Sequence, residues 1–118
     1  MLRKSLFHAV FEATKGLAER LRQLGGSQLD GAALVDYCFA VKTGSLRINA
    51  FRTETEISEH TGFANLLKGV FGTFRNPPAH TPRATAGWTI TEPDALDLFS
   101  TLSLLHRRLD SATTVSRP

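Results

Sequence analysis

The sequence predicts an all-α protein, a bundle of four to five antiparallel helices. Apolar residues recur at three- and four-residue spacing in each main segment, which is the pattern of an amphipathic helix. Short stretches rich in glycine, proline, serine and threonine separate these segments, and short connections favour antiparallel neighbours. Residues 46–51 instead alternate apolar and polar side chains, so we expect an extended or irregular connector there.

The first two helices have clear start and stop signals. An apolar stripe predicts a helix from about residue 2 to residue 24, and Gly25 and Gly26 end it. Asp30 is a suitable N-cap for a second helix, about 31–41. Its inward face is predicted to consist of Leu34, Val35, Cys38 and Phe39.

The third helical segment opens with Thr53 and Glu56, which have the spacing of a capping box. Thr61 and Gly62 interrupt the segment, because glycine costs about 1 kcal/mol relative to alanine inside a helix. The segment is therefore predicted to form one helix or two. Its apolar face is predicted to consist of Ile57, Phe63, Leu66, Leu67, Val70, Phe71 and Phe74.

The last helix is predicted to start after Thr91, with Pro93 in its first turn, and to continue to about Leu109. With 118 residues the chain fits one domain, which we place at 1–112. Residues 113–118 form a polar tail that is expected to be disordered.

Composition narrows the functional classes. The formal net charge of +3 agrees with an anionic partner, and a solvated helix surface explains it equally well. No apolar run approaches the roughly 20 residues of a membrane span, and the N-terminus lacks the pattern of a secretory signal. We therefore expect a cytoplasmic protein that does not insert into a membrane.

Metal and cysteine chemistry are not predicted. Cys38 is the one cysteine, which excludes an internal disulfide and a cysteine-based zinc site, and its position favours a buried structural thiol. The four histidines show no metal-ligand spacing. No cofactor is expected.

The stretch from Gly72 to His80, GTFRNPPAH, carries the chemistry. Pro77 and Pro78 stop the preceding helix and force a turn, which would bring His80 back beside Arg75 and Asn76. A cation, an amide and a titratable imidazole suit a phosphodiester. The alternative is a helix C-terminus with a solvated histidine, where Arg75 complements the helix dipole.

This motif, Arg-Asn-x-x-x-His after an apolar helix in a small helical domain, resembles the HEPN superfamily of metal-independent ribonucleases and toxins. The pattern Gly62-Phe63, Leu66-Leu67-Lys68-Gly69 and Arg75-Asn76-Pro77-Pro78-Ala79-His80 is similar to the Ymh family of bacteria and phages. The opening of the second helix, 29–34, adds to the resemblance, which extends from about residue 5 to residue 112. Members usually carry this domain at the C-terminal end of a longer protein, so the chain is either a stand-alone copy or one domain.

The resemblance implies a toxin-antitoxin or phage-defence endoribonuclease that cleaves RNA by attack of the ribose 2′-OH. Arg75, Asn76 and His80 would be catalytic, without a metal. Arg47, Arg52 and Arg83 are candidate contacts to the RNA backbone. In active HEPN ribonucleases two protomers form one cleft, and an antitoxin or a flanking domain would be a further partner. Many HEPN domains are non-catalytic modules that bind RNA, a nucleotide or a protein, and this alternative stays open.

Two further observations remain open at this point, and a third concerns regulation. Gly69 and Gly72 indicate either close approach of another helix, from this or a second subunit, or simple tolerance of glycine. Glu12 is either an extra polar group of the cleft or a solvated helix residue. The position two residues after His80, where some HEPN toxins have a modified tyrosine, is Pro82, so regulation by that route is not expected.

Overall fold

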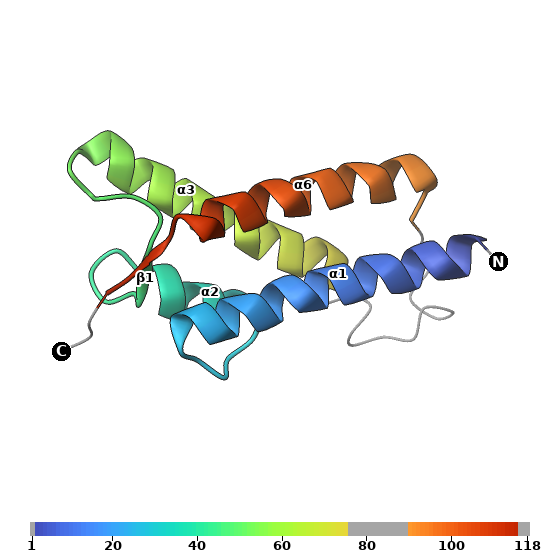
Figure 1. Ribbon diagram of the computed structural model, residues 1–118, viewed down its shortest axis with the longest axis horizontal. Helices are drawn as coiled ribbons and strands as arrows, with labels where there is room; N and C mark the ends of the chain where they lie inside the picture. The colour runs from blue at the N-terminus through green and yellow to red at the C-terminus, as the bar shows by residue number, and fades with distance from the viewer. Residues whose placement is uncertain (1, 76–89, 116–118) are drawn as a thin grey trace.

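The computed structural model describes residues 2–75 and 90–115. Over this part of the chain four α-helices pack together and two very short strands pair at one end, which confirms the predicted all-α bundle (Figure 1). The elements are α1 (Leu2–Gly25), α2 (Gly31–Phe39), β1 (Leu46–Arg47), α3 (Glu54–Val70), the π-helical turn η1 (Phe71–Arg75), α6 (Glu92–Asp110) and β2 (Thr113–Thr114).

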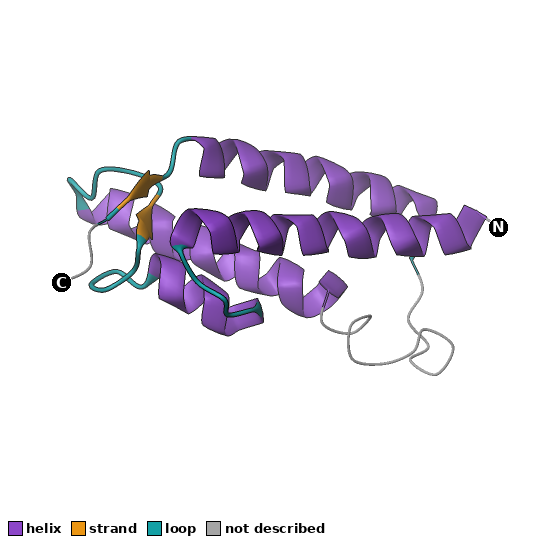
Figure 2. Cartoon of the chain, turned by 60° about the horizontal axis from the view of Figure 1, so that its bottom comes forward, coloured by secondary structure: helices purple, strands orange, loops and turns teal. Residues whose placement is uncertain are grey.

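The longest helix, α1, organises the packing. It lies along α6 on one side and contacts α2 and η1 on the other, while α2 packs against α3 (Figures 1 and 2). The helices α3 and α6 are not among the closely packed pairs. The bundle therefore closes around α1 and stays open along the line between α3 and α6.

Burial of apolar side chains holds these helices together. On α1 the side chains of Val10, Leu17 and Leu21 are fully buried, as their spacing predicts. Each removes enough apolar surface from water to contribute about 1.5–3 kcal/mol. The same core includes Leu34, Val35, Cys38, Phe63, Leu67, Val70, Phe71, Ala95, Leu98, Leu102, Leu105 and Leu109.

The predicted N-caps are present. Asp30 accepts a hydrogen bond from the backbone N–H of Gly31 at 2.8 Å. The hydroxyls of Thr53 and Thr91 each accept one from the backbone N–H three residues further along the chain, that of Glu56 and that of Asp94. The capping box at Thr53 is shifted by one residue, because the Glu56 carboxylate accepts from the N–H of Arg52 at 2.9 Å. These caps satisfy donors that the first helical turn would leave without partners.

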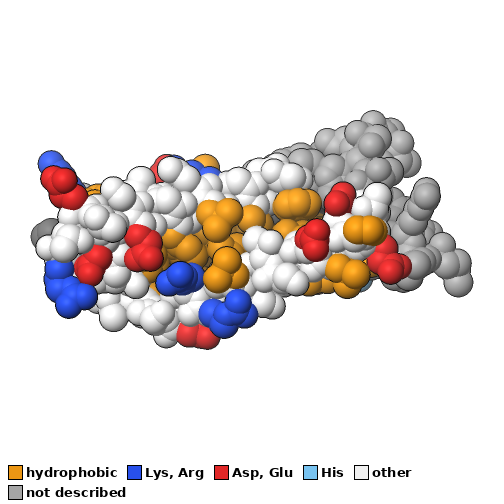
Figure 3. Space-filling model, turned by 90° about the horizontal axis from the view of Figure 1, so that it is seen from above, with side chains coloured by type: hydrophobic (Ala, Val, Ile, Leu, Met, Phe, Trp, Pro, Cys, Tyr) orange, Lys and Arg blue, Asp and Glu red, His pale blue; other side chains and the backbone are white. Residues whose placement is uncertain are grey.

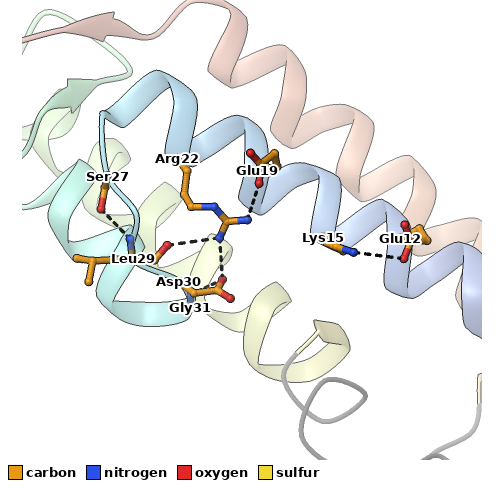
Figure 4. A network of polar contacts seen from close by, with 8 residues as sticks. All are labelled: Glu12, Lys15, Glu19, Arg22, Ser27, Leu29, Asp30 and Gly31. Carbon is orange, nitrogen blue, oxygen red and sulfur yellow. Dashed lines mark hydrogen bonds and ion pairs between the residues drawn. The ribbon is translucent and has the colours of Figure 1, made fainter.

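An ion-pair network joins α1 to the start of α2 (Figure 4). Arg22 donates to the Glu19 carboxylate at 2.8 Å and to the Leu29 carbonyl at 3.4 Å, and it lies 3.4 Å from the Asp30 carboxylate. The guanidinium thus bridges the two helices across the connecting turn. Because the network is largely at the surface, we expect it to orient the turn more than to stabilise it.

The structure settles one open alternative and corrects two expectations. α3 continues without a break through Thr61 and Gly62, so the third segment is one helix. α2 ends at Phe39 and not at residue 41, because Ala40 makes the last helical hydrogen bond, to the Asp36 carbonyl, and its ψ of 135° takes the chain out of the helix. Leu66 is 44% exposed and does not belong to the core face.

The C-terminal segment carries structure that the sequence did not predict. Thr113 and Thr114, which fall in the expected disordered tail, pair antiparallel with Arg47 and Leu46. The N–H of Val115 extends the pairing by donating to the Ser45 carbonyl at 2.8 Å. Backbone hydrogen bonds therefore tie the end of α6 to the connector after α2.

Gly44 marks a corner where the backbone packs too closely for a side chain. A Cβ at this position would lie 2.5 Å from the Cys38 carbonyl oxygen and 2.6 Å from that of Ala40. Both atoms belong to the backbone, so neither can move aside cheaply. At Gly16 on α1, by contrast, no described atom lies within 4 Å of the corresponding Cβ.

We therefore predict that Gly44→Ala lowers the free energy of unfolding by about 1–3 kcal/mol through overpacking. Gly16→Ala, the matched control, should raise it by up to about 1 kcal/mol, because alanine is the better helix former. Urea denaturation followed by circular dichroism measures both. Equal effects of the two substitutions would contradict the close packing at this corner.

Candidate functional site

The helix α3 leads into η1, a π-helical turn whose last residue is Arg75. Phe71 anchors the turn, because its ring is fully buried where η1 contacts α1, α2 and α3. Phe74 is half-buried against the same core. Single π-helical turns inside helices are rare and frequently occur at functional sites. The backbone at Arg75 is thus held by a buried aromatic ring four residues earlier.

Most of the predicted catalytic residues lie outside the described part of the chain. Asn76 and His80, together with the candidate RNA contact Arg83, fall within residues 76–89, and for Arg75 only the backbone is described. The expected meeting of the arginine, the amide and the imidazole therefore stays a prediction from the sequence.

Arg47 and Arg52 lie at the other end of α3. The 17 residues of that helix correspond to about 26 Å at 1.5 Å per residue, so within one protomer neither side chain reaches the Arg75 end. The Arg47 guanidinium lies 4.2 Å from the Phe51 ring centroid, and Arg52 pairs with the Glu56 carboxylate at 3.0 Å. The Arg52 backbone N–H and guanidinium hold the pKa of Glu56 below its usual value. Both arginines already have partners in the protein.

A groove opens between α3 and α6, on the face shown in Figure 3. Its larger cavity, about 600 Å³, is bounded by α3, η1 and the first half of α6. A smaller cavity of about 230 Å³ continues it toward the end of α6, and Leu66 borders both. Hydrophobic side chains gather along the middle of this face, with both acidic and basic side chains beside them (Figure 3). We call this feature the α3/α6 groove.

Sequence analysis missed the polar residues of this groove. Asp94 and Asp97 border the larger cavity, as do Asn65 and Thr101. Neither carboxylate forms an ion pair with any residue of the described chain. A signal in the sequence that indicates these groove residues is the three- and four-residue spacing of Asp94, Asp97 and Thr101 beside the core positions of α6.

His60 is a structural residue. Its ring is fully buried, Nε2 lies 2.8 Å from the Phe39 carbonyl oxygen, and Nδ1 lies 3.5 Å from the backbone nitrogen of Ile48. The partners define a neutral tautomer in which Nε2–H donates and Nδ1 accepts. The rings of Phe39 and Phe51 contact the His60 ring edge-on, with centroid-to-centroid distances of 5.2 and 4.7 Å. Burial, chiefly, lowers the pKa of His60.

Two other residues considered from the sequence lie away from any site: Glu12 is at the surface and Cys38 is in the core. The Glu12 side chain is exposed, and its Oε2 lies 3.9 Å from Nζ of Lys15 on the same helix, an ion pair that is drawn in Figure 4. Cys38 is fully buried, as predicted for a structural thiol. Across the part of the chain that the structure describes, no three His, Cys, Asp or Glu side chains gather in a way that could hold a metal ion.

Gly69 and Gly72 are both exposed, and no described atom lies within 4 Å of a Cβ built on either. No described helix of the same chain approaches them closely. Approach of a second subunit and simple tolerance of glycine both remain open.

The protein belongs to the class of small all-α bundles. Its third helix leads into a π-helical turn whose last residue, Arg75, opens the Arg-Asn-x-x-x-His sequence. Within that class, the chain belongs to the Hypoth_Ymh family, described as a protein of unknown function, whose model matches residues 1–109. Neither a curated protein nor a solved structure matches the chain. Within residues 2–75 and 90–115, none of the helices combines the length and apolar composition needed to cross a bilayer.

The environment of His60 predicts a loss of stability in mild acid. Its pKa is lowered in the folded protein, so below about 6.5, the ordinary value for histidine, the unfolded chain binds more protons. The free energy of unfolding should fall as the pH drops from 7.5 through this range. Urea titrations at several pH values measure the slope.

His106 provides the comparison, because burial and the neighbouring Arg20 lower its pKa as well. Because the pKa of each histidine is lowered in the folded protein, we expect His60→Gln and His106→Gln each to reduce the pH dependence of the free energy of unfolding. A His60→Gln protein with an unchanged slope between pH 7.5 and 5.5 would contradict the assignment.

Proposed function

We propose that this protein is a metal-independent endoribonuclease of the toxin-antitoxin or phage-defence type, with Arg75, Asn76 and His80 as its catalytic residues. The observation that carries the proposal is the position of Arg75, the last residue of an anchored π-helical turn and the first residue of the Arg-Asn-x-x-x-His sequence. Membership in the Ymh family supports it through the resemblance of that family to HEPN ribonucleases.

The proposed reaction is an internal transesterification. The ribose 2′-oxygen forms a bond to phosphorus while the bond from phosphorus to the 5′-oxygen breaks. His80 accepts the 2′-OH proton or delivers a proton to the leaving 5′-oxygen. Arg75 neutralises charge that grows on the phosphoryl oxygens, and Asn76 holds the phosphate or the imidazole. The products are a 2′,3′-cyclic phosphate and a 5′-hydroxyl.

The charges on the described surface suggest where the RNA would lie. The carboxylates of Asp94 and Asp97 disfavour a phosphate backbone along the α3/α6 groove. Arg83 is the nearest further cation in sequence for contacts to the backbone. Arg47 and Arg52 lie too far from Arg75 to share its phosphate within one protomer, so any RNA contact they make is at a separate point.

The competing proposal is a non-catalytic module that binds RNA, a nucleotide or a protein partner. The specific observation in favour of its protein-binding form is the α3/α6 groove, whose cavity is large enough for a ligand but carries the wrong charge for RNA. Purified protein incubated with mixed RNA in EDTA separates the two proposals. Cyclic phosphate ends support the enzyme, and intact RNA that is bound saturably supports the module.

His80→Ala should abolish RNA cleavage and leave RNA affinity and the melting temperature nearly unchanged, because only proton transfer is lost. The loss should reach about 10²–10⁴-fold, the usual contribution of a general acid or base. Cleavage is measured by the appearance of cyclic phosphate ends. Full activity of this variant would refute the role of His80.

Arg75→Lys should also fail to cleave. Lysine keeps the charge but loses the planar, two-pronged donor geometry that matches a phosphate. If Arg75 merely complements the helix dipole, lysine serves nearly as well and stability changes by less than about 1 kcal/mol. Single-turnover cleavage together with thermal melting distinguishes these outcomes.

We also propose that the active form is a homodimer in which two copies of the Arg75–His80 segment face each other. One small bundle provides few donors for a single phosphate, and a two-fold pair doubles them. Light scattering at micromolar concentration should therefore report a dimer. A monomer with undiminished ribonuclease activity would rule out this arrangement.

A further inference from the structure

Exposed or half-buried residues on both sides of the α3/α6 groove follow the spacing of a coiled-coil seam. On α3 and η1, alternating steps of three and four residues connect Glu59, Gly62, Leu66, Gly69 and Thr73. On α6 the same steps connect Asp94, Asp97, Thr101, Leu104 and Arg108. This spacing keeps side chains on one face of a helix, where a partner helix packs between them. The groove is thus bordered by two rows of side chains with helical periodicity.

The middle of the groove is apolar and has room for side chains from a partner. Leu66 and Leu104 are 44% and 41% exposed, although both belong to helices with well-formed core faces. Gly62 and Gly69 add no side chain, and no described atom lies within 4 Å of a Cβ built on either. Small residues at such positions allow a second helix to approach closely. The groove therefore suits an amphipathic helix that inserts leucine-like side chains.

The charges of the groove indicate which helix it suits. Glu59, Asp94 and Asp97 border it together with one guanidinium, that of Arg108, so its formal charge is −2 on a chain whose net charge is +3. Asp94 and Asp97 have no ion-pair partner in the described chain, and Glu59 accepts only a hydrogen bond from Asn49 at 2.9 Å. A second copy of the same face would double the carboxylates, which makes it the poorer occupant.

We propose that the α3/α6 groove is the docking site for a basic amphipathic helix of another protein, with leucine-like residues between Leu66 and Leu104 and lysine or arginine beside Asp94 and Asp97. This binding does not require RNA or catalysis. It would persist in a protein that fails every ribonuclease test, so the two proposals can fail separately.

The probe is a synthetic, fluorescently labelled helical peptide of about four turns, with leucines at alternating three- and four-residue spacing and lysines beside them. A sister peptide carries glutamate in place of every lysine, and a third has the lysine peptide's composition in scrambled order. Fluorescence anisotropy should show saturable binding of the lysine peptide. The glutamate and scrambled peptides should bind at least about tenfold more weakly, since they lose charge complementarity and the apolar stripe respectively.

Gly62→Leu gives the sharpest variant test. The added side chain fills the groove while the free helix tolerates it, so the melting temperature should rise by a few degrees as peptide affinity falls at least about tenfold. Gly16→Leu is the matched control on α1, also exposed and free of neighbours among the described atoms. It should raise the melting temperature similarly and leave peptide affinity unchanged.

Two further variants keep the test decisive if Gly62→Leu fails to fold. Leu66→Ala should weaken the lysine peptide about tenfold through lost apolar contact. Asp97→Asn should weaken it about threefold and reduce its salt dependence, whereas Glu12→Gln, on α1, should do neither.

Three results would overturn the proposal. The first is equal binding of the lysine and glutamate peptides, and the second is unchanged affinity in both Gly62→Leu and Leu66→Ala. The third is a dimer that Gly62→Leu converts to a monomer while the lysine peptide does not bind. That result would assign the groove to a second copy of this chain.

Discussion

The fold depends on the burial of one face of α1. This helix is the element that contacts α2, η1 and α6, and its fully buried side chains Val10, Leu17 and Leu21 lie at the centre of the core. The other helices are arranged around it. Because α1 occupies the inner side of the bundle, α3 and α6 each pack against neighbours there and not closely against each other. The groove between them is thus a consequence of how α1 is buried.

Local signals in the sequence were sufficient for most of the helices. Asp30, Thr53 and Thr91 cap helices as predicted, since an N-cap depends on a side chain and the backbone N–H groups one to three residues further on. Gly62 left one helix or two open from the sequence, and its unfavourable propensity is outweighed by the buried neighbours Phe63, Ala64 and Leu67. Tertiary burial decides whether a glycine ends a helix.

Features that depend on distant parts of the chain could not be predicted. The pairing of Thr113 and Thr114 with β1 joins residues more than 60 positions apart, and two-residue strands leave no periodic pattern. Leu66 fits an apolar stripe equally well on the core side or the groove side of α3, and the crossing of helices decides between them. The candidate catalytic residues show the opposite situation: Arg75, Asn76 and His80 were found from a motif, and their geometry remains a prediction.

The π-helical turn η1 accommodates one extra residue between the end of α3 and the motif. A π-helical turn holds about one residue more than an α-helical turn. Removal of one residue between Phe71 and Arg75 would therefore let the backbone return to α-helical geometry with the helical phase at Arg75 nearly unchanged. In a regular α-helix the same deletion would rotate the following residue by about 100° around the helix axis. The turn thus gives this segment a place where its length can change by one residue while the direction of the Arg75 backbone is kept.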